Sequence, residues 1–319
     1  MIRLWQGTGG LAAAANEWRG YEPASVFQRY ELARAWWESY GGDAQLVIVR
    51  AESAGGSALL PLVRCSAAPQ FEVLGAGSFD HLDVLLRGVA PLDRVRDALA
   101  CIGCRHLRIR ATPRASALAQ MVPQVFTAAD ERPFSAMPVV HTGSTTAAEL
   151  RQRHPRGAYR HRRLLARGGR VEDVTEARTA RHLLAWALRH KRAALDDAQR
   201  DWLDPDARFE GWLAALIDQH LGGLVRLVQL KVASATAATL LFFAESSRWS
   251  LYLIAYDPEF RSDSPGAVLL WSVLERAAES HVPSVNMLTG EQWFKTRWQD
   301  GAVPLVTIDA VLNQAAICA

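Results

Sequence analysis

Hydrophobic positions in the second half of the chain recur with the periods of strands and helices. Apolar residues fill short runs between 224 and 255, and they return at helical spacing on either side of these runs. Ser264 stands where a helix N-cap belongs, and Pro265 occupies the first helical position. The pattern predicts strand 170–174, helices 177–194 and 206–220, strands 224–232, 236–244 and 249–255, helix 265–280, strand 283–288, helix 291–298 and strand 305–311.

The first half gives a similar but less regular series, in which the first strand is unclear. We predict helix 27–38, strands 45–50, 58–64, 71–75 and 82–86, helix 91–101 and strand 106–110. Two prolines and scattered small residues over 127–146 indicate a boundary. A helix over 157–167 follows, ended by two glycines. From the repeated order we predict two domains, 1–140 and 141–319, and infer a tandem duplication.

Composition and charge narrow the class of protein only slightly. Half of the 319 residues are hydrophobic and 22% are charged, as in soluble globular proteins. The net charge of +3 is too small to indicate DNA or a membrane surface, and no apolar run approaches the length of a membrane span. The four cysteines suggest no bridge framework, which fits a cytoplasmic protein. Charge is concentrated locally, because residues 151–170 hold eight arginines and no acid.

The segment from Tyr252 to Gly266 carries the most informative chemistry. It ends a predicted strand and passes through a polar loop into a helix N-terminus, where free backbone N–H groups and the helix dipole favour a phosphate. Gly266 permits close approach of a ligand, and Arg261 can add a charge-assisted contact. The other interpretation is a capped helix after a loop with no ligand.

This segment resembles the GNAT domain of FemAB/CelD-like acyltransferases, the family of the BioF2-like acetyltransferase domain. The family pattern is a Tyr-rich strand, DPxYxxxSPG, a helix, a strand and G…YK..W. The matching positions here are Tyr252, Tyr256, Asp257, Pro258, Ser264, Pro265, Gly266, Leu288, Gly290, Phe294, Lys295 and Trp298. Weaker likenesses lie at Phe27-Gln28, at 79–83 and at Tyr159-Arg160. Many relatives have Asp at Asn286 and Tyr at Phe294.

The resemblance implies an α/β fold of tandem GNAT-like domains, each a mixed, mainly antiparallel sheet flanked by helices, with the first domain degenerate. It implies acetyl-CoA or another acyl-CoA as donor and no metal. The donor would lie where two strands splay, with backbone N–H groups of Leu253 to Ala255 on the thioester carbonyl. Its phosphates would lie on the loop. The residues expected to bind it are Leu253, Ala255, Arg261, Ser262, Ser264, Gly266, Arg160 and Arg163.

The residues expected to act on the substrate are more loosely defined. Lys295 could stabilise an oxyanion or hold a phosphate, or it could be a solvated lysine. Tyr256 is an expected acid for the leaving thiolate. His190 lies on an apolar helical stripe, as a packed histidine or a base.

Five further side chains are candidates for the acceptor site. Asp80 and Asp83, beside His81, could deprotonate an amine or position an acceptor hydroxyl, or they could cap a turn. Trp293 and Trp298 flank Lys295 and could line an acceptor pocket, together with Tyr252. The single CxxC pair at Cys101 and Cys104 does not predict zinc, because no second pair accompanies it.

Three functions remain open from the sequence. The first is transfer of an acyl group from acyl-CoA to an amine or hydroxyl of a small-molecule or cell-envelope acceptor. The second keeps the fold but takes the donor from aminoacyl-tRNA or a carrier protein, which the arginines of 151–170 favour. The third is a GNAT scaffold that binds without catalysis, which Asn286 supports. The basic helix could equally be a solvated face.

Overall fold

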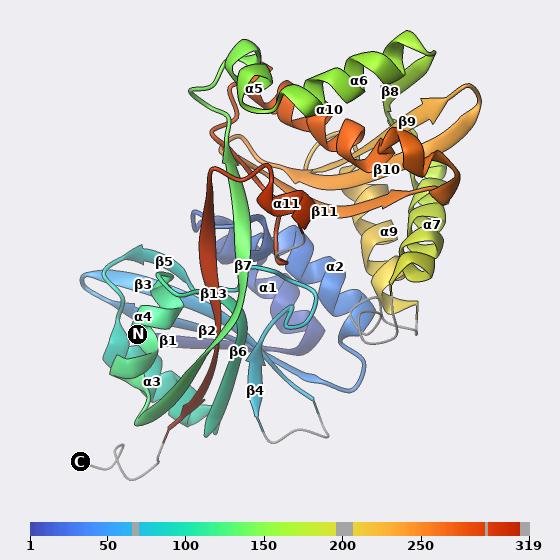
Figure 1. Ribbon diagram of the computed structural model, residues 1–319. Coiled ribbons are helices and arrows are strands. Elements are labelled where there is room, and N and C mark those ends of the chain that lie inside the picture. Colours follow the sequence, from blue (N-terminus) through green and yellow to red (C-terminus); the bar gives the residue numbers. More distant parts are fainter. Residues whose placement is uncertain (66–69, 196–206, 291–292, 313–319) are drawn as a thin grey trace. The chain divides into compact units, whose positions relative to one another are not determined.

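The computed structural model describes residues 1–65, 70–195, 207–290 and 293–312, without the side chains of Trp293 and Phe294 (Figure 1). The contacts divide the chain into two units. One unit comprises residues 1–136 together with residues from 303 onward, and the other comprises residues 137–302.

The first unit is built on a sheet with the strand order β1-β2-β3-β4-β6-β13-β7, and β5 pairs with β3. Strands β4 and β6 are parallel, whereas β1, β2 and β3 pair antiparallel. Helices α1 and α3 both pack on β2. The elements are β1 (Ile2–Gln6), α1 (Gly7–Arg19), η1 (Val26–Gln28), α2 (Tyr30–Tyr40), β2 (Gln45–Ser53), β3 (Gly56–Arg64), β4 (Phe71–Val73), β5 (Leu85–Gly88), α3 (Leu92–Cys101), β6 (His106–Pro113), α4 (Ala117–Val125), β7 (Ala128–His141) and β13 (Gly301–Val311).

The second unit has the order β7-β12-β11-β10-β9-β8 and receives only the last residues of β7. Strands β11 and β12 are parallel, and β8 to β11 pair antiparallel. Its elements are α5 (Ala147–Arg153), α6 (Pro155–Ala166), β8 (Gly169–Asp173), α7 (Ala177–Ala194), α9 (Arg208–His220), β9 (Val225–Val232), β10 (Ala235–Ala244), β11 (Arg248–Tyr256), η3 (Pro258–Asp263), α10 (Pro265–Glu279), β12 (Ser284–Asn286) and α11 (Trp293–Thr296).

The two units repeat one plan, which confirms the predicted fold class. In each unit, antiparallel strands lead to a single parallel pair that follows a crossover helix, α3 before β6 and α10 before β12. The division by contacts differs from the boundary predicted at residue 140, because the C-terminal strand β13 pairs with β6 of the first unit.

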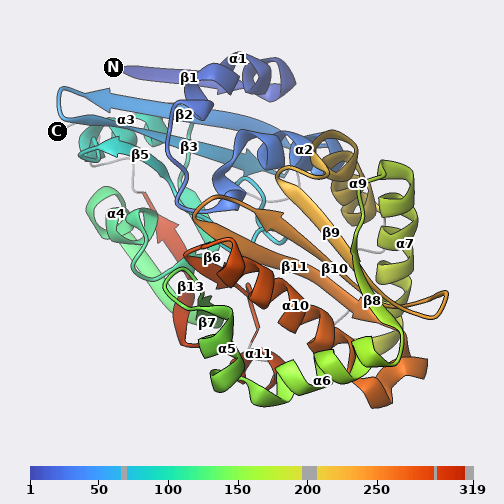
Figure 2. The same cartoon turned by 90° about the horizontal axis from the view of Figure 1, so that it is seen from above.

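Helices cover both faces of the second unit's sheet. Helix α10 packs on β10 and β11, and α6 lies along α10 (Figures 1 and 2). On the opposite face α7 packs on β11 and against α9. The core between α10 and the sheet holds Trp271, Val268 and Leu240, which are almost completely buried. Their burial removes large apolar surfaces from water and fixes where α10 begins.

The structure corrects the sequence pattern at several places, and it adds helices α4 and α5, which were not predicted. Residues 127–146, predicted as a boundary loop, contain the 14-residue strand β7. The strand was missed because its first half is exposed and shows no alternation of apolar and polar residues. The predicted loop after β11 contains the 3-10 helix η3. The unclear first strand of the first half is β1, followed directly by α1. Among the helices that the structure describes, none has the length and apolar character needed to cross a membrane.

Candidate active site

The site predicted at the end of β11 lies where this strand loses one of its neighbours. Strand β11 pairs with β10 along its whole length, but with β12 only from Arg248 to Ser250. Strand β12 ends at Asn286, whose side-chain oxygen accepts from the Leu288 N–H at 2.9 Å. The next residue turns toward β7, because the Met287 N–H donates to the Pro138 carbonyl. The two parallel strands therefore diverge, and no other described strand pairs with that edge of β11.

The backbone groups on this open edge belong to alternate residues. The Asp257 N–H donates to the Ala237 carbonyl of β10 at 3.0 Å. Because successive residues of a strand face opposite neighbours, Leu253 and Ala255 also turn their N–H groups toward β10. The N–H groups of Ile254 and Tyr256 face the open edge instead. The expected donors at Leu253 and Ala255 are thus displaced by one residue, a shift that the sequence could not reveal.

A β-bulge in β11 aims the side chains at the start of α10. The register shifts between Leu241 and Phe242, so that one extra residue, Tyr252, is inserted in β11. As a result Leu251 and Ile254, three residues apart, both pack against the core under α10. Ile254 and Tyr256 lie beside Gly266, where an added Cβ would be 3.6 Å and 3.7 Å from them. The ring of Tyr252 instead packs with Phe209, Trp212 and Phe243, whose centroids lie 5.3–6.0 Å away.

The start of α10 offers fewer free donors than the sequence suggests. Ser264 is the N-cap residue and Pro265 is at the first position, as predicted, but Ser264 has φ 54° and makes no side-chain capping bond. The Ala267 and Val268 N–H groups both donate to the Ser264 carbonyl, and Pro265 has no N–H. In this first turn, which the structure describes in full, the Gly266 N–H is left without an intrahelical acceptor.

The loop before α10 is tied to the basic helix through one carboxylate. Asp263 accepts from Arg163 at 3.2 Å and from Arg167 at 2.8 Å. Arg261 and Ser262 are exposed on η3. Arg163 is therefore engaged with the loop itself, in place of the donor phosphate expected from the sequence.

His190 lies next to the end of β11. Its Nδ1 is 2.9 Å from the Trp186 carbonyl, which can only accept, so Nδ1 carries the proton and Nε2 is an acceptor in the neutral ring. Nε2 lies 4.0 Å from Asp257 Oδ2, and the Trp186 ring stacks on the imidazole at 4.0 Å between centroids. Asp257 is thus placed to stabilise an imidazolium formed at His190.

The predicted site residues on and after α11 lie in different environments. Lys295 is half-buried, and its ammonium group donates to the Thr289 carbonyl. The side chain of Trp293 lies outside the described part of the chain. Trp298 is buried, with its ring centroid 4.8 Å from His154 and 6.0 Å from Trp271.

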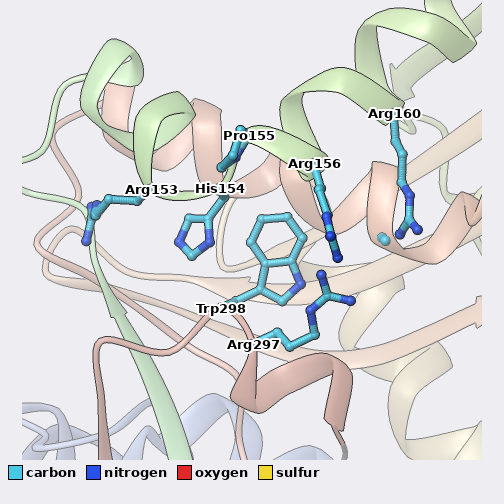
Figure 3. A pocket seen from close by; sticks show the side chains of 9 residues that line it. Arg153, His154, Pro155, Arg156, Arg160, Arg297 and Trp298 are labelled. Atoms are coloured by element: carbon cyan, nitrogen blue, oxygen red, sulfur yellow. The ribbon is translucent and has the colours of Figure 1, made fainter.

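An arginine-lined cavity of about 300 Å³ lies at the start of α6, and the sequence did not predict it (Figure 3). The cavity is lined by Arg153, His154, Pro155, Arg156, Gly157, Arg160, Ala267, Arg297 and Trp298. The expected residues Arg160 and Trp298 belong to it, but Arg156 and Arg297 were missed. Burial and the Arg153 charge lower the pKa of His154, so the cavity is basic through its arginines.

The acids expected at the acceptor site belong to the first unit. Asp83 is buried, and its Oδ1 accepts from Leu118 N at 2.7 Å and Val84 N at 2.8 Å. Burial raises the pKa of Asp83. It therefore holds the start of α4, which is the turn-capping alternative. Asp80 is half-buried in the preceding turn of the same unit, whereas His190, Tyr256 and Lys295 belong to the other.

Comparison with known proteins supports one family. Residues 152–296 match the model of the acetyltransferase (GNAT) domain family. Among proteins with curated functions, none matches this chain significantly. FemX is similar in fold, with a TM-score of 0.64 at 11% identity over 98% of both chains. So is the C-terminal domain of a protein from Agrobacterium fabrum named as a lysylphosphatidylglycerol synthetase, with a TM-score of 0.57, 13% identity and coverage of 98% of this chain and 94% of that chain.

A third structure matches the repeated plan. It is a tandem GNAT protein from the clavulanic acid biosynthesis pathway, with a TM-score of 0.50 at 12% identity and coverage of 98% of both chains. At these low identities the structures share a fold with this chain, but the likeness does not show that they share a substrate. Residues 152–296 thus match the acetyltransferase (GNAT) domain family, and the chain shares its fold, with the repeated plan and the diverging strands β11 and β12, with FemX and the tandem GNAT protein.

Proposed function

We propose that the second unit transfers an acyl group from acyl-CoA to an amine, or to a hydroxyl, of a small-molecule or cell-envelope acceptor. The observation that carries the proposal is the open edge of β11 beside the α10 N-terminus. A thioester inserted there would meet N–H groups of Ile254 and Tyr256, and its phosphates would lie near Gly266. Donors of this kind stabilise the oxyanion of the tetrahedral intermediate by about 3 kcal/mol.

The chemistry needs a proton path as well as a polarised carbonyl. The acceptor nitrogen attacks the carbonyl carbon, the C–S bond breaks, and the amine proton must leave while the thiolate gains one. We assign the first role to His190 Nε2, with Asp257 stabilising the imidazolium, and the second to the Tyr256 hydroxyl. Tyr256 is 40% exposed, so its hydroxyl can exchange protons with solvent between turnovers.

Calorimetric titration with CoA and acetyl-CoA tests the donor. Gly266→Ala is the matched control, because its methyl group would make only ordinary contacts at 3.6–3.7 Å. Gly266→Trp would fill the space in front of Ile254 and Tyr256. We expect micromolar binding by the wild type and by Gly266→Ala, and its loss in Gly266→Trp. Absence of wild-type binding at millimolar ligand would overturn the acyl-CoA donor.

Aminoacyl-tRNA is the second candidate donor, and a carrier-protein-bound acyl group would use the same site. Two observations favour tRNA: the arginines of 151–170, and the fold shared with FemX and with a protein named as a lysylphosphatidylglycerol synthetase. Phosphate contacts release counterions, so the affinity for tRNA should fall steeply with salt. An affinity for tRNA that does not change with salt concentration, or no binding of tRNA, would argue against this donor.

A scaffold that only binds is the remaining alternative, and Asn286 is its support in the sequence. In the structure, however, the Asn286 side-chain oxygen accepts a hydrogen bond from the Leu288 N–H at the end of β12. This structural role does not require a side chain that can act as a base. Replacing Lys295 by Ala separates the alternatives, because an enzyme would lose turnover whereas a binding module would keep its ligand affinity.

A further inference from the structure

Arginines dominate the lining of the cavity at the start of α6. None of the residues lining it, all of which the structure describes, is acidic. Arg153 pairs with Asp300 at its rim, with 2.6 Å between Nη1 and Oδ1. Arg156 and Arg160 have no carboxylate within 4.0 Å among the described residues. Figure 3 shows Arg156 and Arg297 pointing toward one another from different segments.

The proximity of Arg156 and Arg160 costs free energy unless an anion lies between their guanidinium groups. Arg156 and Arg160 are four residues apart on α6, so they occupy one face of the helix, and like charges at this spacing are destabilising. The N-terminus of α6 begins at Pro155 in the wall of the cavity, and its dipole adds positive potential. A phosphate can accept several charge-assisted hydrogen bonds at once from guanidinium groups arranged in this way.

The cavity's floor keeps these groups in place. The buried Trp298 ring lies under α6, and Gly157 lets the helix backbone approach it closely. Ala267 of α10 also lines the cavity, one residue beyond Gly266. The volume of about 300 Å³ is at the small end for ligand sites, and it suits one or two phosphate groups better than an extended nucleic-acid backbone.

We propose that this cavity is a binding site for a small phosphorylated ligand, whose phosphomonoester or diphosphate group is held by Arg156, Arg160 and Arg297. The proposal does not depend on the identity of the acyl donor. The phosphate could belong to the donor or to the acceptor, since both chemistries present the same oxygens to the arginines.

Titration of the full chain with inorganic pyrophosphate, at fixed ionic strength, tests the site. The variants are Arg156→Gln and Arg297→Gln, and the matched control is Arg162→Gln, an exposed arginine on the same helix outside the cavity. Hydrogen bonds to charged groups contribute enough that each cavity variant should weaken binding about tenfold or more, while the control stays unchanged. Thermal melts check that all variants fold.

Two results would overturn the proposal: no saturable wild-type binding at millimolar pyrophosphate, or an equal loss in Arg162→Gln, which would indicate a general charge effect. The source of the phosphate follows from a second titration with CoA present. Displacement of pyrophosphate by CoA assigns the cavity to the donor, and simultaneous binding assigns it to the acceptor. If CoA does not bind at all, the acyl-CoA proposal fails while the pyrophosphate result stands.

Discussion

Replacement of Gly157 by Ala tests how closely α6 lies over the cavity floor. An added Cβ would be 2.2 Å from Trp298 Cη2 and 3.1 Å from Trp271 Cε3. Alanine normally stabilises a helix by about 1 kcal/mol relative to glycine. Here both indoles are buried, and inserting a methyl group into a well-packed site costs about 1–3 kcal/mol. Because the contact with Trp298 is far below any normal distance, we expect a net loss of about 1–2 kcal/mol.

Urea unfolding, followed by intrinsic fluorescence and circular dichroism, measures this loss. Gly9→Ala in α1 is the control, since nothing lies within 4 Å of its added Cβ and the change should be neutral or slightly stabilising. In a Trp298→Leu background the cost of Gly157→Ala should largely disappear, because the clashing ring is gone. A Gly157→Ala protein that unfolds at the wild-type urea concentration, or above it, would refute the close approach.

Three further substitutions give distinct outcomes. Asp83→Ala should destabilise by about 1–3 kcal/mol, because it leaves two buried N–H groups unsatisfied, whereas Asp83→Asn keeps an acceptor; equal losses would refute the capping role. The folded-state pKa of Asp83 is raised above its usual 3.8, so the stability that it contributes is fully present below that pH and declines as pH rises through the folded pKa, a trend absent from urea melts of Asp83→Asn. Asp263→Asn should change the unfolding free energy by less than about 1 kcal/mol, because both of its arginine partners are exposed; a larger loss would show that the pairs are structural. Lys295→Ala should lower kcat about a hundredfold with little change in CoA affinity, and unchanged kcat would remove Lys295 from the reaction.

The sequence predicted elements well wherever one face of an element is buried. Strands β9, β10 and β11 begin and end within about one residue of the predicted bounds, because each is apolar over its length and bounded by polar turns. Strand β7 was missed because its first residues are exposed and carry no alternation. Its pairing with β13 depends on residues more than 150 positions away, and no local pattern records this.

The site could be predicted only where its residues are close in sequence. The run from Tyr256 to Gly266 forms one local structure, and the structure places it at the end of β11 as expected. Some arginines of 151–170, by contrast, find their acids in distant segments: Arg151 pairs with Glu275, and Arg153 with Asp300. The lack of acids within the segment therefore could not show which of its arginines are paired, and the convergence of Arg156 with Arg297 could not be predicted either.

The position of β13 has a consequence for how the protein is made. This strand lies between β6 and β7 in the first unit, although it leaves the ribosome after every other strand that the structure describes. Residues 137–302 are contiguous and can fold during synthesis, whereas the first unit must wait with an open sheet edge until residues 303–311 emerge. A nascent chain halted before that point would expose unpaired backbone, the kind of edge that promotes aggregation. Folding of the N-terminal half is thus coupled to synthesis of residues 303–311, the reverse of simple vectorial order.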